Sequence, residues 1–116
     1  MTETNVASAV AHYQAMAAKD LPAMARHSHP DARLVTPMEQ LAGKAAVLEA
    51  SQRLLAFIQS IEVHARLGSE HQAMLTYDMN FAEPIGVCCA AALVTFQDGL
   101  IVRNELFFDA SPFKRD

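Results

Sequence analysis

The sequence predicts an α+β fold in which helices come first and hairpin-linked strands follow. In the first half of the chain, apolar residues recur at three- and four-residue steps, which is typical of amphipathic helices. In the second half, apolar and polar residues alternate, which is typical of strands. The turn Gln97-Asp98-Gly99 supplies the positive-φ residues that a tight hairpin needs. Helices and strands that are separated along the chain in this way indicate an α+β domain.

Three helices are predicted. The first runs from a cap at Thr4 or Asn5 to about Lys19, because its apolar residues form one stripe. The second begins after Asp20, which is a good N-cap, and is ended by the pair His29-Pro30. Together with the third, the predicted helices span residues 4–19, 21–27 and 44–59.

Five strands are predicted, and they should form an antiparallel sheet that curves around the helices and leaves a pocket between them. A short strand at residues 32–36 is followed by a loop at 38–41 and, after the third helix, by strands at 60–67 and 72–82. The last two strands flank the Asp98-Gly99 turn within residues 87–109, a hairpin expected at the centre of the sheet. Phe113 in the tail is expected to pack against this sheet.

Composition limits what the chain is. Its 116 residues suit one domain, 1–116, with a substantial core, since 52% of them are hydrophobic. A net charge of −4 without a basic run predicts no nucleic-acid partner. The sequence has no apolar run long enough for a membrane span, and its start lacks the features of a secretory signal, so we expect no membrane partner and a cytoplasmic location. Cys88 and Cys89 are neighbours on a strand and should point to opposite faces, so neither a disulfide nor joint metal binding is expected.

Four segments in this order resemble the nuclear transport factor 2-like superfamily, and within it the SnoaL-like and ketosteroid-isomerase-like groups. They are AVAHYQAMAAKDLPAM, HPDARLVTP, the helix start GKAAV, and DGLIVRNELFFD. The resemblance implies a cone-shaped, cystatin-like sheet wrapped around N-terminal helices, in the order α-α-β-α-β-β-β-β, with a pocket at the wide end. It also implies a homodimer packed through the sheet. The superfamily includes isomerases, epoxide hydrolases, cyclases, dehydratases and non-catalytic binding domains, so the fold does not fix the function.

Carried over residue by residue, the known catalytic groups of these relatives are missing. The aspartate base of the steroid isomerases falls on Thr36, which cannot abstract a proton near neutral pH. Their oxyanion-hole tyrosine falls on His12, with Tyr13 one residue away and rotated by about 100° around the helix. Their second oxyanion donor falls on Ala92, and the last-strand aspartate of the epoxide hydrolases falls on Leu106. The resemblance therefore supplies no complete catalytic constellation.

Two residues remain as candidate acid and base. Asp78 shares a strand face with Thr76 and Asn80; if that face looks into the pocket, as the resemblance implies, burial would raise the pKa of Asp78. If the face looks outward, it is an ordinary solvated surface, as the fully apolar opposite face suggests. His12 borders the apolar stripe of the first helix and could act as a base near working pH, or simply be a partly exposed helix residue.

The remaining site predictions are a pocket wall and the absence of a metal. Small and apolar residues of the hairpin leave room either for a ligand or for helix side chains. The predicted substrate-binding residues are Tyr13, Met16, Thr36, Tyr77, Cys88, Ala90, Ala92, Asn104, Leu106 and Phe108. His27 and His29 form an H-x-H pair that can bind zinc or cap a helix end, but no third ligand is evident, so no metal and no cofactor are predicted.

Two functions from different classes are consistent with these residues. One is proton-transfer chemistry of the isomerase, cyclase or hydratase type on a small apolar molecule, with His12 and Asp78 as acid and base. The other is a non-catalytic ligand-binding or dimerisation domain of the same fold. A close approach of Asp78 and His12 inside a closed cavity would separate the two.

Overall fold

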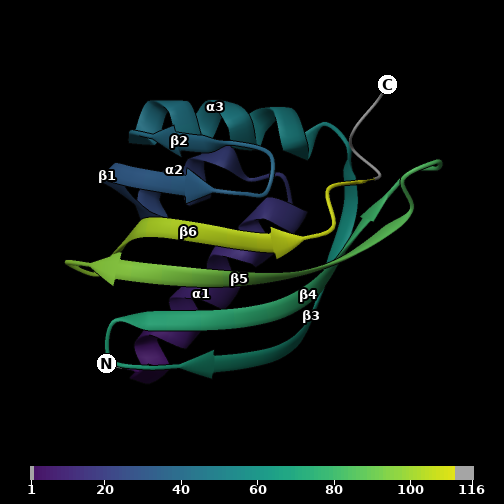
Figure 1. Cartoon of the computed structure of the whole chain (residues 1–116). Helices are drawn as coiled ribbons and strands as arrows, with labels where there is room; N and C mark the ends of the chain where they lie inside the picture. The colour runs from purple at the N-terminus through teal and green to yellow at the C-terminus, as the bar shows by residue number, and fades with distance from the viewer. Residues whose placement is uncertain (1, 112–116) are drawn as a thin grey trace.

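The computed structural model describes residues 2–111, which form three helices on one curved sheet (Figure 1). The elements are α1 (Thr2–Ala17), α2 (Leu21–His27), β1 (Ser28–Val35), β2 (Gln40–Ala42), α3 (Lys44–Leu55), β3 (Ile58–Gly68), β4 (Gln72–Phe81), β5 (Val87–Gln97) and β6 (Leu100–Phe108). The α+β prediction is confirmed. The expected packing of Phe113 falls outside the described residues. Within the described residues, none of the helices has the length and apolar character that crossing a bilayer requires.

The sheet has six strands in the order β2-β1-β6-β5-β4-β3, with β2 and β3 at its edges. Neighbouring strands are antiparallel except β1 and β6, which run parallel, with Leu34 opposite Asn104. The predicted antiparallel pairing is therefore correct except between β1 and β6, and the loop predicted over residues 38–41 is wrong at residues 40 and 41, which belong to β2. Strand β2 has only three residues, too few for an alternation to show in the sequence.

All three helices lie on the same face of the sheet. Helix α1 packs against β3 and β4, α3 packs over β1 and β2, and α2 lies between α1 and α3. Strand β4 shows how the sequence produces this arrangement: Leu75, Tyr77 and Met79 point toward the helices and are buried, whereas Asp78 lies on the other face. The apolar side chains of Leu75 and Met79 each contribute roughly 1.5–3 kcal/mol by leaving water.

Local signals in the sequence explain most element boundaries. The Asp20 carboxylate accepts a hydrogen bond from the backbone N–H of Ala23 at 3.2 Å, which is the predicted N-cap of α2. Asp98 and Gly99 have φ values of 56° and 78°, so they form the predicted hairpin turn. Helix α3 ends four residues earlier than predicted, because the buried Ile58 belongs to β3 rather than to the helix.

Candidate functional site

A pocket opens between α3 and the strands β1 and β6. An inner cavity of about 50 Å3 adjoins an outer hollow of about 330 Å3 that is open to solvent. The two share four lining residues, Leu34, Ala50, Leu54 and Leu106. The walls are predominantly apolar, and the parallel pairing of β1 with β6 brings both strands to the same side of the pocket.

The amide of Asn104 is a polar group at the base of this pocket. Asn104 is 6% exposed and lines the inner cavity. Its Oδ1 accepts a hydrogen bond of 3.0 Å from the buried hydroxyl of Tyr13 on α1. This bond orients the amide, and Nδ2 has no partner among the residues that the structure describes. The side chain therefore presents an available N–H donor at the cavity.

His12 of α1 is another polar residue that lines the inner cavity. The side chain is buried, and its Nδ1 has no hydrogen-bond partner among the described residues. The ring lies 5.6 Å, centroid to centroid, from the ring of His27, whose buried Nδ1 also lacks a partner there. Burial, and secondarily the neighbouring His27, lowers the pKa of His12 to about 4. His12 is therefore a neutral imidazole at physiological pH and can accept a proton.

The contact between His12 and His27 was missed by the sequence analysis. His27 had been considered only together with His29, as a possible zinc pair. His29 instead lies on β1, where its Nδ1 accepts a hydrogen bond of 3.0 Å from the backbone N–H of Asp31. Burial lowers the pKa of His27 as well, with a further lowering from the adjacent Arg26. The close packing of α2 against α1 creates this pair, and no spacing in the sequence signals it.

Tyr13 and Tyr77 pack against each other in the core, and the ring of Tyr13 contacts that of His12. The two tyrosine rings lie 4.8 Å apart, and both side chains are fully buried. Burial raises the pKa of Tyr13 to about 12, and burial together with the neighbouring Tyr13 raises the pKa of Tyr77 well above its usual value. The Tyr77 hydroxyl has no hydrogen-bond partner of good geometry among the described residues. The hydroxyl of Tyr13 thus positions the amide of Asn104, whereas Tyr77 contributes by filling space in the core.

Thr36 lies at the mouth of the outer hollow but its hydroxyl is already engaged. It accepts hydrogen bonds from the backbone N–H groups of Met38 and Glu39, at 3.1 and 3.0 Å, and donates to the Glu39 carbonyl at 3.2 Å. The hydroxyl therefore holds the turn between β1 and β2. The exposed Met38 and Phe57 make the surrounding rim apolar.

Asp78 lies on the face of the sheet that points away from the helices. Its carboxylate is 2.8 Å from Nε2 of His64 on β3 and a quarter exposed. The hydrogen bond to His64 lowers the pKa of Asp78 below its usual value, the opposite of what burial in a pocket would do. The expectation that Asp78 faces His12 across the pocket is therefore wrong. The apolar alternation of β4 had indicated this orientation, because the fully apolar face must be the buried one.

The other predicted site residues divide into two groups. Met16, Leu106 and Phe108 line the pocket, together with His12, Thr36 and Asn104. Cys88, Ala90 and Ala92 lie on the inner face of β5 as predicted, but they are buried and do not line either hollow. Tyr13 and Tyr77 are also buried and line neither hollow. These five residues therefore pack in the core of the protein and do not form the wall of a ligand pocket.

Comparisons with known proteins agree with this architecture. A model of the SnoaL-like domain family matches residues 9–104. Among solved structures, a protein from Kribbella flavida has a TM-score of 0.89 at 24% identity, covering 95% of this chain and 90% of that chain. A steroid delta-isomerase from Pseudomonas aeruginosa has a TM-score of 0.76 at 23% identity, covering 91% and 80%. An epoxide hydrolase from M. tuberculosis has a TM-score of 0.84 at 12% identity, covering 96% and 86%. At such low sequence identities, the structural similarity shows a shared fold and no more. A search of curated proteins finds no significant match.

Proposed function

Because the chain belongs to the SnoaL-like domain family of the nuclear transport factor 2-like superfamily, we propose that its pocket binds a small apolar molecule and converts it by proton transfer. The observation that carries the proposal is that His12 and Asn104 both line the inner cavity, which adjoins the apolar outer hollow. The hollow has the size and apolar character of a small-molecule site with few polar groups. The ligand we expect carries one carbonyl group on an apolar body.

His12 and Asn104 offer complementary chemistry toward such a ligand. The neutral imidazole of His12 takes a proton from the carbon next to the carbonyl, and the Nδ2 amide of Asn104 donates a hydrogen bond to the oxygen as it becomes negative. The imidazolium then returns the proton to another carbon, which completes an isomerisation without any other reactant. A base with a pKa of about 4 suffices for this chemistry where the developing oxyanion is stabilised.

Ligand binding without conversion is the competing function, and one observation favours it. Among the described residues that line the inner cavity, His12 is the only group that can accept a proton near neutral pH. With no carboxylate there, the cavity has no second group to orient the imidazole or stabilise its charged form. The two functions share the pocket and differ in whether a proton leaves the bound ligand.

Binding is tested by thermal-shift screening of the chain with steroids, terpenoid epoxides and polyketide-like aromatics. A ligand at 100 times its Kd should stabilise the protein by about 2.7 kcal/mol and raise Tm by several degrees. Asn104→Leu should reduce this shift, whereas Asp78→Asn, on the opposite face, should leave it unchanged. Equal loss of the shift in both variants would contradict a pocket between α3 and β6.

Conversion is tested with the same ligands in deuterated water, by mass spectrometry. Proton transfer predicts that deuterium enters the ligand beside its carbonyl, and that His12→Phe slows this exchange by a factor of about 100 or more. A ligand that binds to the wild type without exchange would identify a binding protein. Exchange that continues at the wild-type rate in His12→Phe would exclude His12 as the base.

A further inference from the structure

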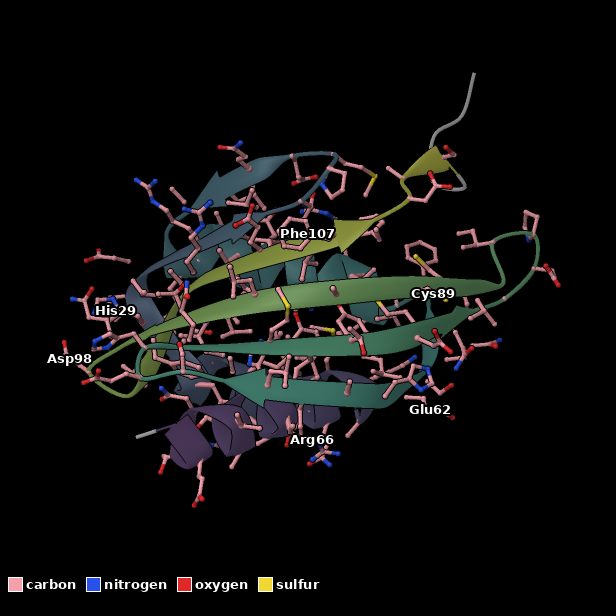
Figure 2. The ribbon with its side chains drawn as sticks, turned by 60° about the horizontal axis from the view of Figure 1, so that its bottom comes forward. His29, Glu62, Arg66, Cys89, Asp98 and Phe107 are labelled. Carbon is pink, nitrogen blue, oxygen red and sulfur yellow. The ribbon has the colours of Figure 1, made fainter. Side chains whose placement is uncertain are left out.

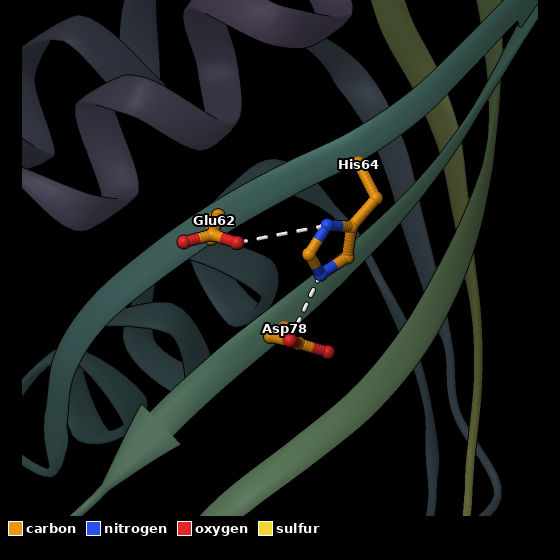
Figure 3. Close-up of side chains that lie close together, drawn as sticks. All are labelled: Glu62, His64 and Asp78. Atoms are coloured by element: carbon orange, nitrogen blue, oxygen red, sulfur yellow. Dashed lines mark hydrogen bonds and ion pairs between the residues drawn. The ribbon is translucent and has the colours of Figure 1, made fainter.

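Glu62, His64 and Asp78 form a compact cluster on the face of the sheet opposite the pocket (Figure 3). Nε2 of His64 is 2.8 Å from Oδ2 of Asp78, and Nδ1 of the same ring is 3.6 Å from Oε1 of Glu62. One ligand atom from each of the three residues lies within 4.8 Å of the others. All three side chains are accessible, the carboxylate of Glu62 most of all. The cluster is therefore open to a partner from solvent.

The fold builds this cluster with two features of strands β3 and β4. Glu62 and Asp78 are opposite one another in the antiparallel register, so their side chains lie side by side on the outer face. The register then shifts between Val63 and Ala65, which makes His64 the extra residue of a β-bulge. A bulge redirects the side chain that it carries, and here His64 points between the two carboxylates.

The charge of the cluster is not balanced. Glu62 and Asp78 bring two negative charges, and a protonated His64 would neutralise only one of them. Among the described residues, no lysine or arginine forms an ion pair with either carboxylate. Exposed ion pairs of this kind are screened by water and contribute little to the stability of the fold. The cluster therefore carries a net negative charge that a bound cation can neutralise.

We propose that Glu62, His64 and Asp78 bind one divalent transition-metal ion of the zinc type. Imidazole nitrogen and carboxylate oxygen are ligands that zinc prefers, whereas calcium and magnesium favour all-oxygen sites. In a tetrahedral site with bonds of about 2.0–2.2 Å, the ligand atoms lie roughly 3.3–3.6 Å apart. One ligand atom of each residue lies within 4.8 Å of the others, and only one ring nitrogen of His64 can bind the ion, so side-chain rotations have to bring these atoms closer to form the site.

Cys89 lies next to this site, although its sulfur is outside the group of three ligand atoms that lie within 4.8 Å of one another. It is the register partner of Asp78 on β5, so a row of outer-face residues runs from Glu62 through Asp78 to Cys89 across three strands. Figure 2 shows Glu62 and Cys89 at the same end of the sheet. The Cys89 thiol is free, exposed and adjacent to the Asp78 carboxylate. Thiolate sulfur is a strong zinc ligand and would complete a coordination shell of four protein side chains.

Calorimetric titration of the untagged, chelator-treated chain with zinc chloride tests the site. We expect one ion per chain with a dissociation constant in the micromolar range. His64→Gln and Asp78→Asn should each weaken binding by about tenfold or more. His71→Gln and Asp98→Asn replace an exposed histidine and an exposed aspartate outside the cluster, and should bind zinc like the wild type. Melting curves in chelator should show that all four variants remain folded, because each changed side chain lies at the surface.

Two further readouts locate the ion without relying on those variants. Zinc should shift the ring proton resonances of His64 in the wild-type protein more than those of the other four histidines. With cobalt(II) in place of zinc, a sulfur-to-metal absorption band should appear and be absent in Cys89→Ser. No binding at millimolar zinc, or unchanged binding in His64→Gln, would overturn the proposal. Binding without the cobalt band would remove Cys89 from the site and leave the other three ligands.

Discussion

When His12 is replaced by leucine, the protein is expected to lose much less stability on acidification than the wild type does. The pKa of His12 is about 4 in the folded protein and about 6.5 when unfolded. Between these values the unfolded chain binds more protons than the folded one, so the free energy of unfolding falls as the pH falls. The contribution is fully present above about pH 6.5, is lost progressively toward pH 4, and amounts to about 3 kcal/mol.

Denaturant unfolding at a series of pH values from neutral to pH 4 measures this difference. The wild type should lose stability more steeply than His12→Leu, while His71→Gln, at an exposed position, should follow the wild type. A shallower slope of the same sign should remain in His12→Leu, because burial also lowers the pKa of His27. At neutral pH, His12→Leu should be as stable as the wild type or more stable, because the change removes a buried nitrogen without a partner. Parallel curves for the wild type and His12→Leu would show that His12 is not neutral and buried.

Two phenylalanine substitutions at neighbouring tyrosines are expected to have opposite consequences. Tyr13→Phe removes the donor that satisfies Oδ1 of buried Asn104 and should lower the free energy of unfolding by about 1–3 kcal/mol. Tyr77→Phe removes a buried hydroxyl that has no partner of good geometry, so stability should stay constant or increase. The rings stay in place in both variants, so packing changes little and the comparison isolates the two hydroxyl groups.

Urea unfolding of both variants, with an unchanged m value, gives the two free-energy differences. The double variant Tyr13→Phe/Asn104→Leu should cost less than the sum of its single changes, because it removes both partners of one buried bond. Additive costs would indicate that the bond between Tyr13 and Asn104 contributes nothing. Equal losses in Tyr13→Phe and Tyr77→Phe would indicate that both hydroxyls are hydrogen-bonded.

The parts of the structure that the sequence predicted are those governed by neighbouring residues. Helix α2 was predicted from residue 21 to 27 because Asp20 and Pro22 mark its start and a His-Pro pair follows its end. The hairpin of β5 and β6 was predicted from Asp98-Gly99 and from the apolar and β-branched residues on either side of this turn. These signals act over a few residues and need no knowledge of the tertiary structure.

The parts that the sequence did not predict depend on elements that are distant in the chain. The parallel contact of β1 with β6 and the packing of His12 against His27 arise from how whole elements are arranged. Asp78 shows a different difficulty: the alternation of β4 indicated the outer face, whereas the family resemblance indicated the pocket. The alternation was the better guide, because burying the apolar face of a strand outweighs a loose correspondence of positions.

The parallel pairing of β1 with β6 has a consequence for how the protein is made. Leu34 of β1 pairs with Asn104 of β6, and the whole of β3, β4 and β5 lies between these two residues in the sequence. Closing so long a loop costs entropy before any contact compensates for it, so this pairing should form late in folding. During synthesis, β1 has no partner on that side until the last strand leaves the ribosome. The α1–β3–β4 layer can assemble earlier, but the pocket between α3, β1 and β6 takes shape only at the end.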